Sequence, residues 1–159
     1  MTKKTTFPPV AIACDHAGLP LKNELIRHLE QRNIPYTDLG TNEPASVDYP
    51  EYAHRLCFEI ASGKSEKGVL VCGTGIGMCM AANKHKGIRA AVVSDTFSAR
   101  MTRMHNDANV LCLGARVVGA GLACDIFDLF FDTPYEGGRH QRRVDMLNAL
   151  DGTVEKKDK

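Results

Sequence analysis

The stretch that decides the fold is Gly68-Val69-Leu70-Val71-Cys72-Gly73-Thr74-Gly75-Ile76-Gly77-Met78. An apolar run leads into Cys72, glycines follow at alternate positions, and an alanine-rich segment continues to Asn83. This order predicts a buried strand, a tight turn and the start of a helix. Glycine lets the turn come close to a ligand, and the first turn of a helix leaves N–H groups that bind anions.

Taken alone, this stretch fits two kinds of site. In the first, the loop binds a phosphate or a nucleotide, and Cys72 is a small buried apolar residue. In the second, the N-terminal end of the helix stabilises a Cys72 thiolate that acts on a ligand. The glycine spacing matches neither the dinucleotide fingerprint nor the Walker motif.

Four further apolar runs predict strands of the same sheet. Strand and helix alternate five times, and the strands are continuously apolar, which is typical of a sheet covered on both faces. We therefore predict an α/β, single-domain, doubly wound (Rossmann-like) fold, with a five-stranded parallel sheet, helices on both faces and a C-terminal helix over residues 139–150. The predicted strands are residues 10–14, 36–39, 68–72, 89–93 and 110–114.

The ends of the chain differ in composition from the part between them. Residues 1–9 read as a flexible leader, residues 10–150 as the folded domain, and residues 151–159 as a charged tail. Two helix boundaries are predicted more closely. One helix covers residues 51–61. Ser94 or Thr96 caps the N-terminus of a later helix, which ends near residues 105–107.

Composition excludes several classes of protein. A net charge of +1 gives no reason to expect nucleic acid or an anionic membrane as a partner. No apolar run approaches the ~18 residues of a membrane span, and the N-terminus lacks the apolar core of a secretory signal. The six cysteines have no Cys-x-x-Cys pair, and three lie in strand-like runs, so reduced thiols and a cytoplasmic location are expected. The six histidines are scattered, so no metal site is predicted.

Polar residues follow three of the predicted strands. Asp15 and His16 follow the first, Cys72 ends the third, and Arg116 comes shortly after the fifth. Ligands of doubly wound sheets bind beyond the carboxyl ends of the strands, which makes these residues candidates for a site.

Motifs distributed over nearly the whole chain resemble one family, that of ribose-5-phosphate isomerase B and the galactose-6-phosphate isomerase subunits. They keep the family's order from about residue 10 to residue 150, which marks these residues as a sugar-phosphate isomerase domain. The matching segments are Cys14-Asp15-His16-Ala17-Gly18, Val47-Asp48-Tyr49-Pro50, Cys72 to Gly77 with Ala81-Ala82-Asn83-Lys84, His105 to Val110, Gly114 to Gly119, and Tyr135 to His140.

The resemblance implies an aldose–ketose isomerase that works through a cis-enediolate without metal or cofactor. Cys72 would be the base that moves a proton between C2 and C1, and His105 would open the furanose ring. Some members carry a glutamate later in this loop, where this chain has Met78, so Cys72 is the one base candidate there. Backbone N–H groups would hold the enediolate oxygens, with the Thr74 hydroxyl beside them. These oxyanion residues are Gly73, Thr74, Gly75, Ile76 and Gly77.

The remaining implied contacts bind the substrate. Asn106 would bind a sugar hydroxyl, and Asp15, His16 and Tyr49 would contact sugar or phosphate. Each has a plainer alternative, since the polar residues suit helix ends and the tyrosine suits simple packing. Three arginines would clamp the phosphate, although a solvated basic face is the ordinary interpretation without the resemblance. They are Arg116, Arg139 and Arg143.

The family builds one pocket from two chains. Carried over, His105, Asn106 and Arg116 would serve the partner's Cys72. We therefore expect an obligate homodimer with shared active sites, with further pairing into a homotetramer left open.

Three functions are consistent with the sequence. The first is interconversion of D-ribose 5-phosphate and D-ribulose 5-phosphate in pentose-phosphate metabolism. The second is isomerisation of a six-carbon sugar phosphate such as galactose or allose 6-phosphate. The third is a non-catalytic nucleotide- or flavin-binding module, which would explain the glycines but gives Cys72, His105 and the arginines no joint purpose.

Overall fold

The computed structural model describes residues 8–152, so most of the predicted leader and tail lies outside the described residues. Five parallel strands form one sheet in the order β2-β1-β3-β5-β4. This confirms the predicted five-stranded doubly wound sheet. The strands are β1 (Val10–Cys14), β2 (Tyr36–Asp38), β3 (Gly68–Cys72), β4 (Ala90–Val92) and β5 (Val110–Gly114).

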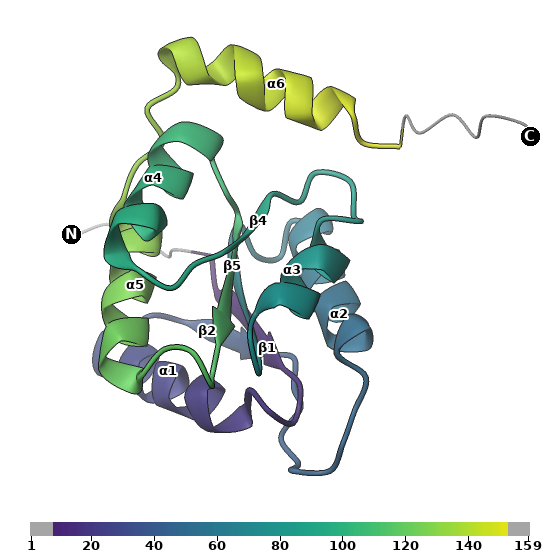
Figure 1. Ribbon diagram of the computed structural model, residues 1–159, viewed down its shortest axis with the longest axis vertical. Coiled ribbons are helices and arrows are strands. Elements are labelled where there is room, and N and C mark those ends of the chain that lie inside the picture. Colours follow the sequence, from purple (N-terminus) through teal and green to yellow (C-terminus); the bar gives the residue numbers. More distant parts are fainter. Residues whose placement is uncertain (1–7, 153–159) are drawn as a thin grey trace, which may run out of the picture.

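Helices cover both faces of the sheet, as Figure 1 shows. On one face lie α1 (Leu19–Gln31), α4 (Thr96–Asn106) and α5 (Ala120–Asp132), which share one apolar cluster with the strands. On the other face, α2 (Tyr49–Ala61) and α3 (Ile76–Ala82) share a second cluster. A short 3-10 helix, η1 (Gly138–His140), leads into the final helix α6 (Gln141–Ala149).

The alternation of side chains along the strands explains why the sequence runs are continuously apolar. In β3, Val69 and Val71 face the first cluster, while Leu70 and Cys72 face the second. Successive strand side chains point to opposite faces, and both faces are covered, so neither can be polar.

Several element boundaries differ from the predicted ones. Strand β2 ends at Asp38, one residue early, and α2 begins at Tyr49 rather than residue 51. The predicted caps Ser94 and Thr96 are wrong, because Asp95 Oδ1 accepts a hydrogen bond of 2.7 Å from the Ser98 N–H. The last α-helix begins at Gln141 because Gly137 and Gly138, at φ +64° and +53°, break the helical path before it.

The sheet has two unlike edges, one at the carboxyl ends of its strands and one at the amino ends, and these edges position the residues of the candidate site. The carboxyl ends of all five strands lie at one edge. The switch point lies between β1 and β3, because the chain passes from β1 to β2 on one side and then to β3 on the other side. In Figure 1 the arrows of β1 and β5 point away from the end that α6 covers. Within residues 8–152, the chain forms no helix that is both long and apolar enough to span a bilayer.

A buried lysine fixes the segment between β2 and α2. Lys22, on α1, has no exposed surface. Its Nζ donates to both carboxylate oxygens of Asp38 at 2.7 and 2.8 Å, and to Asn42 Oδ1 at 2.6 Å. A buried charge is tolerated only with such partners, so this group holds the start of the loop that leads to α2.

Replacing this lysine should therefore destabilise the fold. We expect Lys22→Met to lower the free energy of unfolding by about 3 kcal/mol, because the Asp38 carboxylate loses its partner in a partly buried place. Urea denaturation followed by circular dichroism measures the change. Arg27→Met is the matched control, since Arg27 pairs with Glu24 on the exposed side of α1 and should leave the unfolding midpoint unchanged. Equal effects of the two substitutions would contradict this assignment.

Candidate active site

The turn between β3 and α3 requires its glycines for steric reasons. Gly75 has φ +80°, and a Cβ there would lie 2.9 Å from Val92 Cγ2 and 3.0 Å from the Leu113 carbonyl carbon. A Cβ on Gly77 would lie 2.8 Å from the ring of Tyr49. The turn therefore fits against β4, β5 and the Tyr49 ring, which lies beside Gly77.

Cys72 ends β3 with its sulfur directed at this turn. The Gly75 N–H donates to Cys72 Sγ at 3.1 Å, and the Ile76 N–H donates to Thr74 Oγ1 at 3.3 Å. The thiol is 5% exposed. The N–H groups of Gly75 and Ile76, predicted to hold substrate oxygens, thus form hydrogen bonds within the loop itself. The other glycines of the predicted set, Gly73 and Gly77, lie at the same turn.

Asp15 and His16 lie at the carboxyl end of β1, next to this turn in the sheet. The Asp15 N–H donates to the Val71 carbonyl at 3.2 Å, while its Oδ1 accepts from the Gly18 N–H at 2.9 Å. The Val47 N–H donates to His16 Nδ1 at 3.2 Å. His16 Nδ1 is therefore an acceptor, and a neutral ring carries its proton on Nε2.

Arg116 is found beside the glycine turn of its own chain. Its N–H donates to the Gly73 carbonyl at 3.0 Å, and its Nη1 lies 3.6 Å from the position that a Cβ on Gly73 would take. The sequence resemblance had assigned Arg116 to the partner's site, and this placement differs from that assignment. The reason is topological, because β5 pairs with β3 and both end at the same edge.

The other predicted residues lie at the opposite edge. His105 and Asn106 end α4, and the carbonyl of Asn106 accepts from Arg89 just before β4 begins. A strand of five residues such as β3 separates the two edges by about 13 Å. Within one chain, His105 and Asn106 are therefore not brought together with Cys72.

A histidine stack organises this second group. The rings of His105 and His140 lie 4.2 Å apart at 11°, and Arg139 Nε donates to His140 Nε2 at 3.3 Å. Burial, followed by the positive charges of His105 and Arg139, lowers the pKa of His140. Arg139 and Arg143 stand at the start of α6, so the predicted clamp with Arg116 does not form within one chain.

His105, Glu136 and His140 also deserve a test as metal ligands, because their donor atoms lie within 4.8 Å of one another. The nearly parallel rings direct their nitrogen lone pairs along parallel planes instead of toward one point. Arg139 also donates to His140 Nε2, which is the nitrogen nearest Glu136 Oε2. Arg139 thus already uses the Nε2 lone pair that a metal would need, so this arrangement favours a hydrogen-bonded histidine stack over a tetrahedral metal site.

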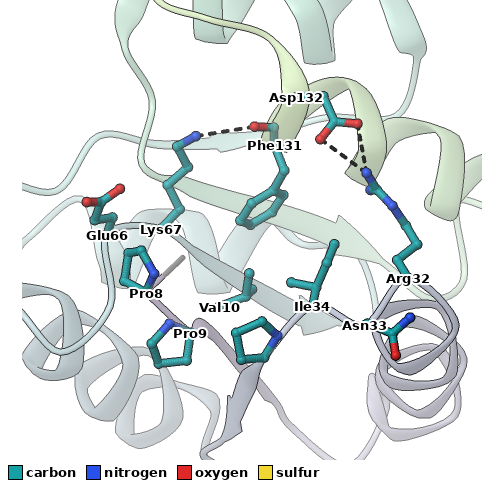
Figure 2. Close-up of a pocket in the computed structure, with 11 residues that line it drawn as sticks. Pro8, Pro9, Val10, Arg32, Asn33, Ile34, Glu66, Lys67, Phe131 and Asp132 are labelled. Carbon is teal, nitrogen blue, oxygen red and sulfur yellow. Dashed lines mark hydrogen bonds and ion pairs between the residues drawn. The ribbon is translucent and has the colours of Figure 1, made fainter. Parts of the chain in front are cut away.

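Two hollows of the surface, both among the described residues, lie away from the glycine turn. Figure 2 shows one of about 660 Å³ beside β1, where Lys67 Nζ donates to the Phe131 carbonyl at 3.4 Å and Arg32 pairs with Asp132. None of the predicted site residues lines it. A second hollow, of about 540 Å³, has Asn106 and Arg89 in its wall, next to α6.

Sequence reasoning missed one unusual thiol. Cys79 lies on α3, where a hydrogen bond with the Cys112 thiol lowers its pKa to about 7. The amide of Asn83 also donates to its sulfur, at 3.5 Å. No sequence motif marks this pair, because the two thiols meet only when α3 packs on β5.

Comparison with known proteins gives one consistent match. The sequence model of the family described as Ribose/Galactose Isomerase matches residues 10–147. Ribose-5-phosphate isomerase B of Escherichia coli K12 is 46% identical over 142 residues, covering 89% of this chain and 95% of that protein. The probable ribose-5-phosphate isomerase B of Mycoplasma pneumoniae is 46% identical over 144 residues, covering 90% and 95%.

Solved structures agree with the sequence match. Ribose-5-phosphate isomerase B of Clostridium thermocellum superposes with a TM-score of 0.90 at 42% identity, covering 92% of this chain and 99% of that one. The enzyme of Thermotoga maritima gives a TM-score of 0.87 at 45% identity, covering 89% and 97%.

The thiols should differ sharply in reactivity. Iodoacetamide reacts with the thiolate, so Cys79, with its pKa lowered to about 7, should be alkylated with a midpoint near neutral pH. Burial raises the pKa of Cys14 and of Cys57 to about 12, so both should stay protonated and unmodified below that pH. Short alkylation pulses at increasing pH, followed by peptide mass spectrometry, give each profile. A Cys79 midpoint at the ordinary value of about 8.5 would contradict the hydrogen-bonded thiolate.

Proposed function

The chain belongs to the ribose/galactose isomerase family, and on this premise we propose that it is a ribose-5-phosphate isomerase. It interconverts D-ribose 5-phosphate and D-ribulose 5-phosphate. The observation that carries this conclusion is the joint agreement of sequence and fold with ribose-5-phosphate isomerase B over nearly the whole chain. The same agreement supports neither a six-carbon substrate nor a nucleotide- or flavin-binding module.

We propose Cys72 as the base. Its thiolate takes the proton from C2 of the open-chain aldose, and the C–H electron pair forms the C1=C2 bond while O1 becomes an oxyanion. The hydroxyl on C2 then passes its proton to the O1 oxyanion, its O–H electron pair forms the C2=O bond, and the C1=C2 electron pair takes the proton back from the thiol at C1, which gives the ketose. Support comes from the position of Sγ at the carboxyl edge beside the switch point, where such sheets bind ligands.

The glycine turn is the proposed oxyanion site. Its N–H groups and the Thr74 hydroxyl stand next to Cys72 and would hold O1 and O2 of the cis-enediolate. A donor of this kind typically stabilises a transition state by about 3 kcal/mol. The Gly75 N–H, which bonds to Sγ here, would stabilise the thiolate form of the base. Nothing in this chemistry requires a metal or a cofactor.

A second chain completes the proposed pocket. Cys72, Asp15 and Arg116 lie at one edge, while His105 and Asn106 lie at the other, so two copies placed edge to edge form two complete sites. In such a homodimer the partner's His105 opens the furanose ring, the partner's Asn106 binds a hydroxyl, and Arg116 clamps the phosphate together with the partner's Arg139 and the partner's Arg143.

Exposed apolar side chains support this assembly, because they occur at both edges. Ile76, Val92 and Val117 follow or end strands at the carboxyl edge and are 53%, 44% and 57% exposed. Met146 and Leu147, on α6 at the amino edge, are 58% and 47% exposed. Such surfaces on one chain are suited to burial against another. All six cysteines are free thiols, which fits the cytoplasm as the proposed location.

The first test is turnover itself. Purified protein should convert ribose 5-phosphate in a coupled assay, equally with and without a chelator. Cys72→Ala should lower kcat at least about 100-fold, because the base is lost, while the circular dichroism spectrum stays unchanged. Cys124→Ala, a half-buried thiol on α5, is the control that should keep full activity. Normal turnover by Cys72→Ala would refute the assigned base.

The second test is complementation between two inactive variants. Unfolding and refolding an equal mixture of Cys72→Ala and His105→Asn should restore about a quarter of the wild-type activity, because half of the dimers are mixed and each mixed dimer holds one intact pocket. Each variant refolded alone is the control and should stay inactive. Sites built within single chains would give no recovery in the mixture.

A further inference from the structure

We infer that Arg89 is a positioning residue for ring opening, because its guanidinium fixes the end of α4 that presents His105 and Asn106. This inference rests on the proposed function. Arg89 stands immediately before β4 and contacts none of the proposed reacting groups through its side chain. Its side chain instead lies along the amino edge, 18% exposed, where it joins α4 to α6.

The first set of contacts is to the backbone of the α4 terminus. Arg89 Nε donates to the carbonyls of Asn106 and Asp107, both at 3.1 Å, and Nη2 donates to the Asp107 carbonyl at 2.8 Å. The last carbonyls of a helix have no partner within the helix. The guanidinium supplies that partner one and two residues after His105, so it sets where the terminal turn points.

The second set involves the carboxylate of Asp107. Asp107 has φ +47°, a left-handed conformation that is uncommon outside glycine. Its Oδ2 accepts from Arg89 Nη2 at 3.0 Å, and its Oδ1 accepts from Arg103 Nη1 at 2.8 Å. Arg103 is 5% exposed. Two guanidiniums thus hold this residue from two sides, and the path of the chain after Asn106 is fixed.

The third contact reaches the last helix. Arg89 Nη1 donates to Asn148 Oδ1 at 3.1 Å, and the neighbouring Gly87 N–H donates to Asp151 Oδ2 at 2.7 Å. Arg139 lies in η1, which leads into α6, and Arg143 lies in α6 itself, so one side chain connects the end of α4 that carries His105 with the helix that carries Arg143. Only a planar fork of N–H groups can make all these bonds at once, and a lysine cannot replace it.

Two measurable rates separate this role from the proton transfer. Ribose 5-phosphate enters mostly as a furanose and needs ring opening. Ribulose 5-phosphate has its O5 esterified, so its C2 carbonyl cannot close a five-membered ring and it enters as an open chain. Its C1 proton can therefore exchange with solvent through Cys72 without any ring step. Misplacing His105 should slow net isomerisation more than it slows this proton exchange, whereas a general loss of folded protein would lower both rates equally.

The experiment compares two rates for Arg89→Lys, the conversion of ribose 5-phosphate and the incorporation of solvent deuterium at C1 of ribulose 5-phosphate. We expect kcat/KM for conversion to fall about tenfold, while the rate of deuterium incorporation changes by less than about twofold. Asp107→Asn, which removes the carboxylate but suits the left-handed backbone, should show the same asymmetry. His105→Asn gives the largest asymmetry for reference. Arg100→Lys, an exposed arginine on the same helix, is the control and should match wild type in both rates.

Hydrogen exchange provides a readout that does not depend on activity. Amides of residues 103–108 should exchange faster in Arg89→Lys than in wild type and in Arg100→Lys. Equal losses of conversion and of deuterium incorporation, or unchanged rates with unchanged amide exchange, would overturn the inference. A wild-type protein without turnover in either direction would instead refute the proposed function, and faster exchange in Arg89→Lys would still show that Arg89 holds the α4 terminus.

Discussion

The constraint on which the structure depends is the common direction of its five strands. Because all strands run the same way, the sheet has one edge where strands end and another where helices return to begin the next strand. Cys72, Asp15 and Arg116 belong to the first edge, and His105 and Asn106 to the second. The proposed chemistry needs both groups and therefore needs two chains. The proposed assembly thus follows from where the proposed site residues lie in the fold.

The sequence predicted the architecture well because two strong signals agree. Continuous apolar runs reveal strands covered on both faces, and the spacing of residues such as Leu21, Leu25 and Leu29 reveals the helices between them. The boundaries were harder, since they depend on single side chains. Asp95 caps α4 where Ser94 and Thr96 were expected, because the carboxylate reaches the Ser98 N–H. The pair Gly137 and Gly138 did not indicate how many residues later the last helix would begin.

The candidate site divides in the same way. The residues at strand ends could be named from the motifs, but the sequence does not say which edge each one occupies. Strand order settles this for Arg116, because β5 lies beside β3, and that order is not written in any motif. Cys79 and Arg89 were overlooked for a related reason. Their partners, Cys112 and Asp107, are distant in sequence and meet them only through packing of helices on the sheet.

The hydrogen bond from the Val47 N–H to His16 has a consequence for selectivity. It uses the lone pair of one ring nitrogen, so the neutral imidazole presents only an N–H on its far side. A ligand atom that contacts this nitrogen must be a hydrogen-bond acceptor. Hydroxyl and phosphoryl oxygens satisfy it, whereas the ammonium of an amino sugar offers a donor to a donor. The loop before α2 thereby gives this imidazole a fixed polarity, and in the proposed substrate site one backbone amide would select against cationic sugars.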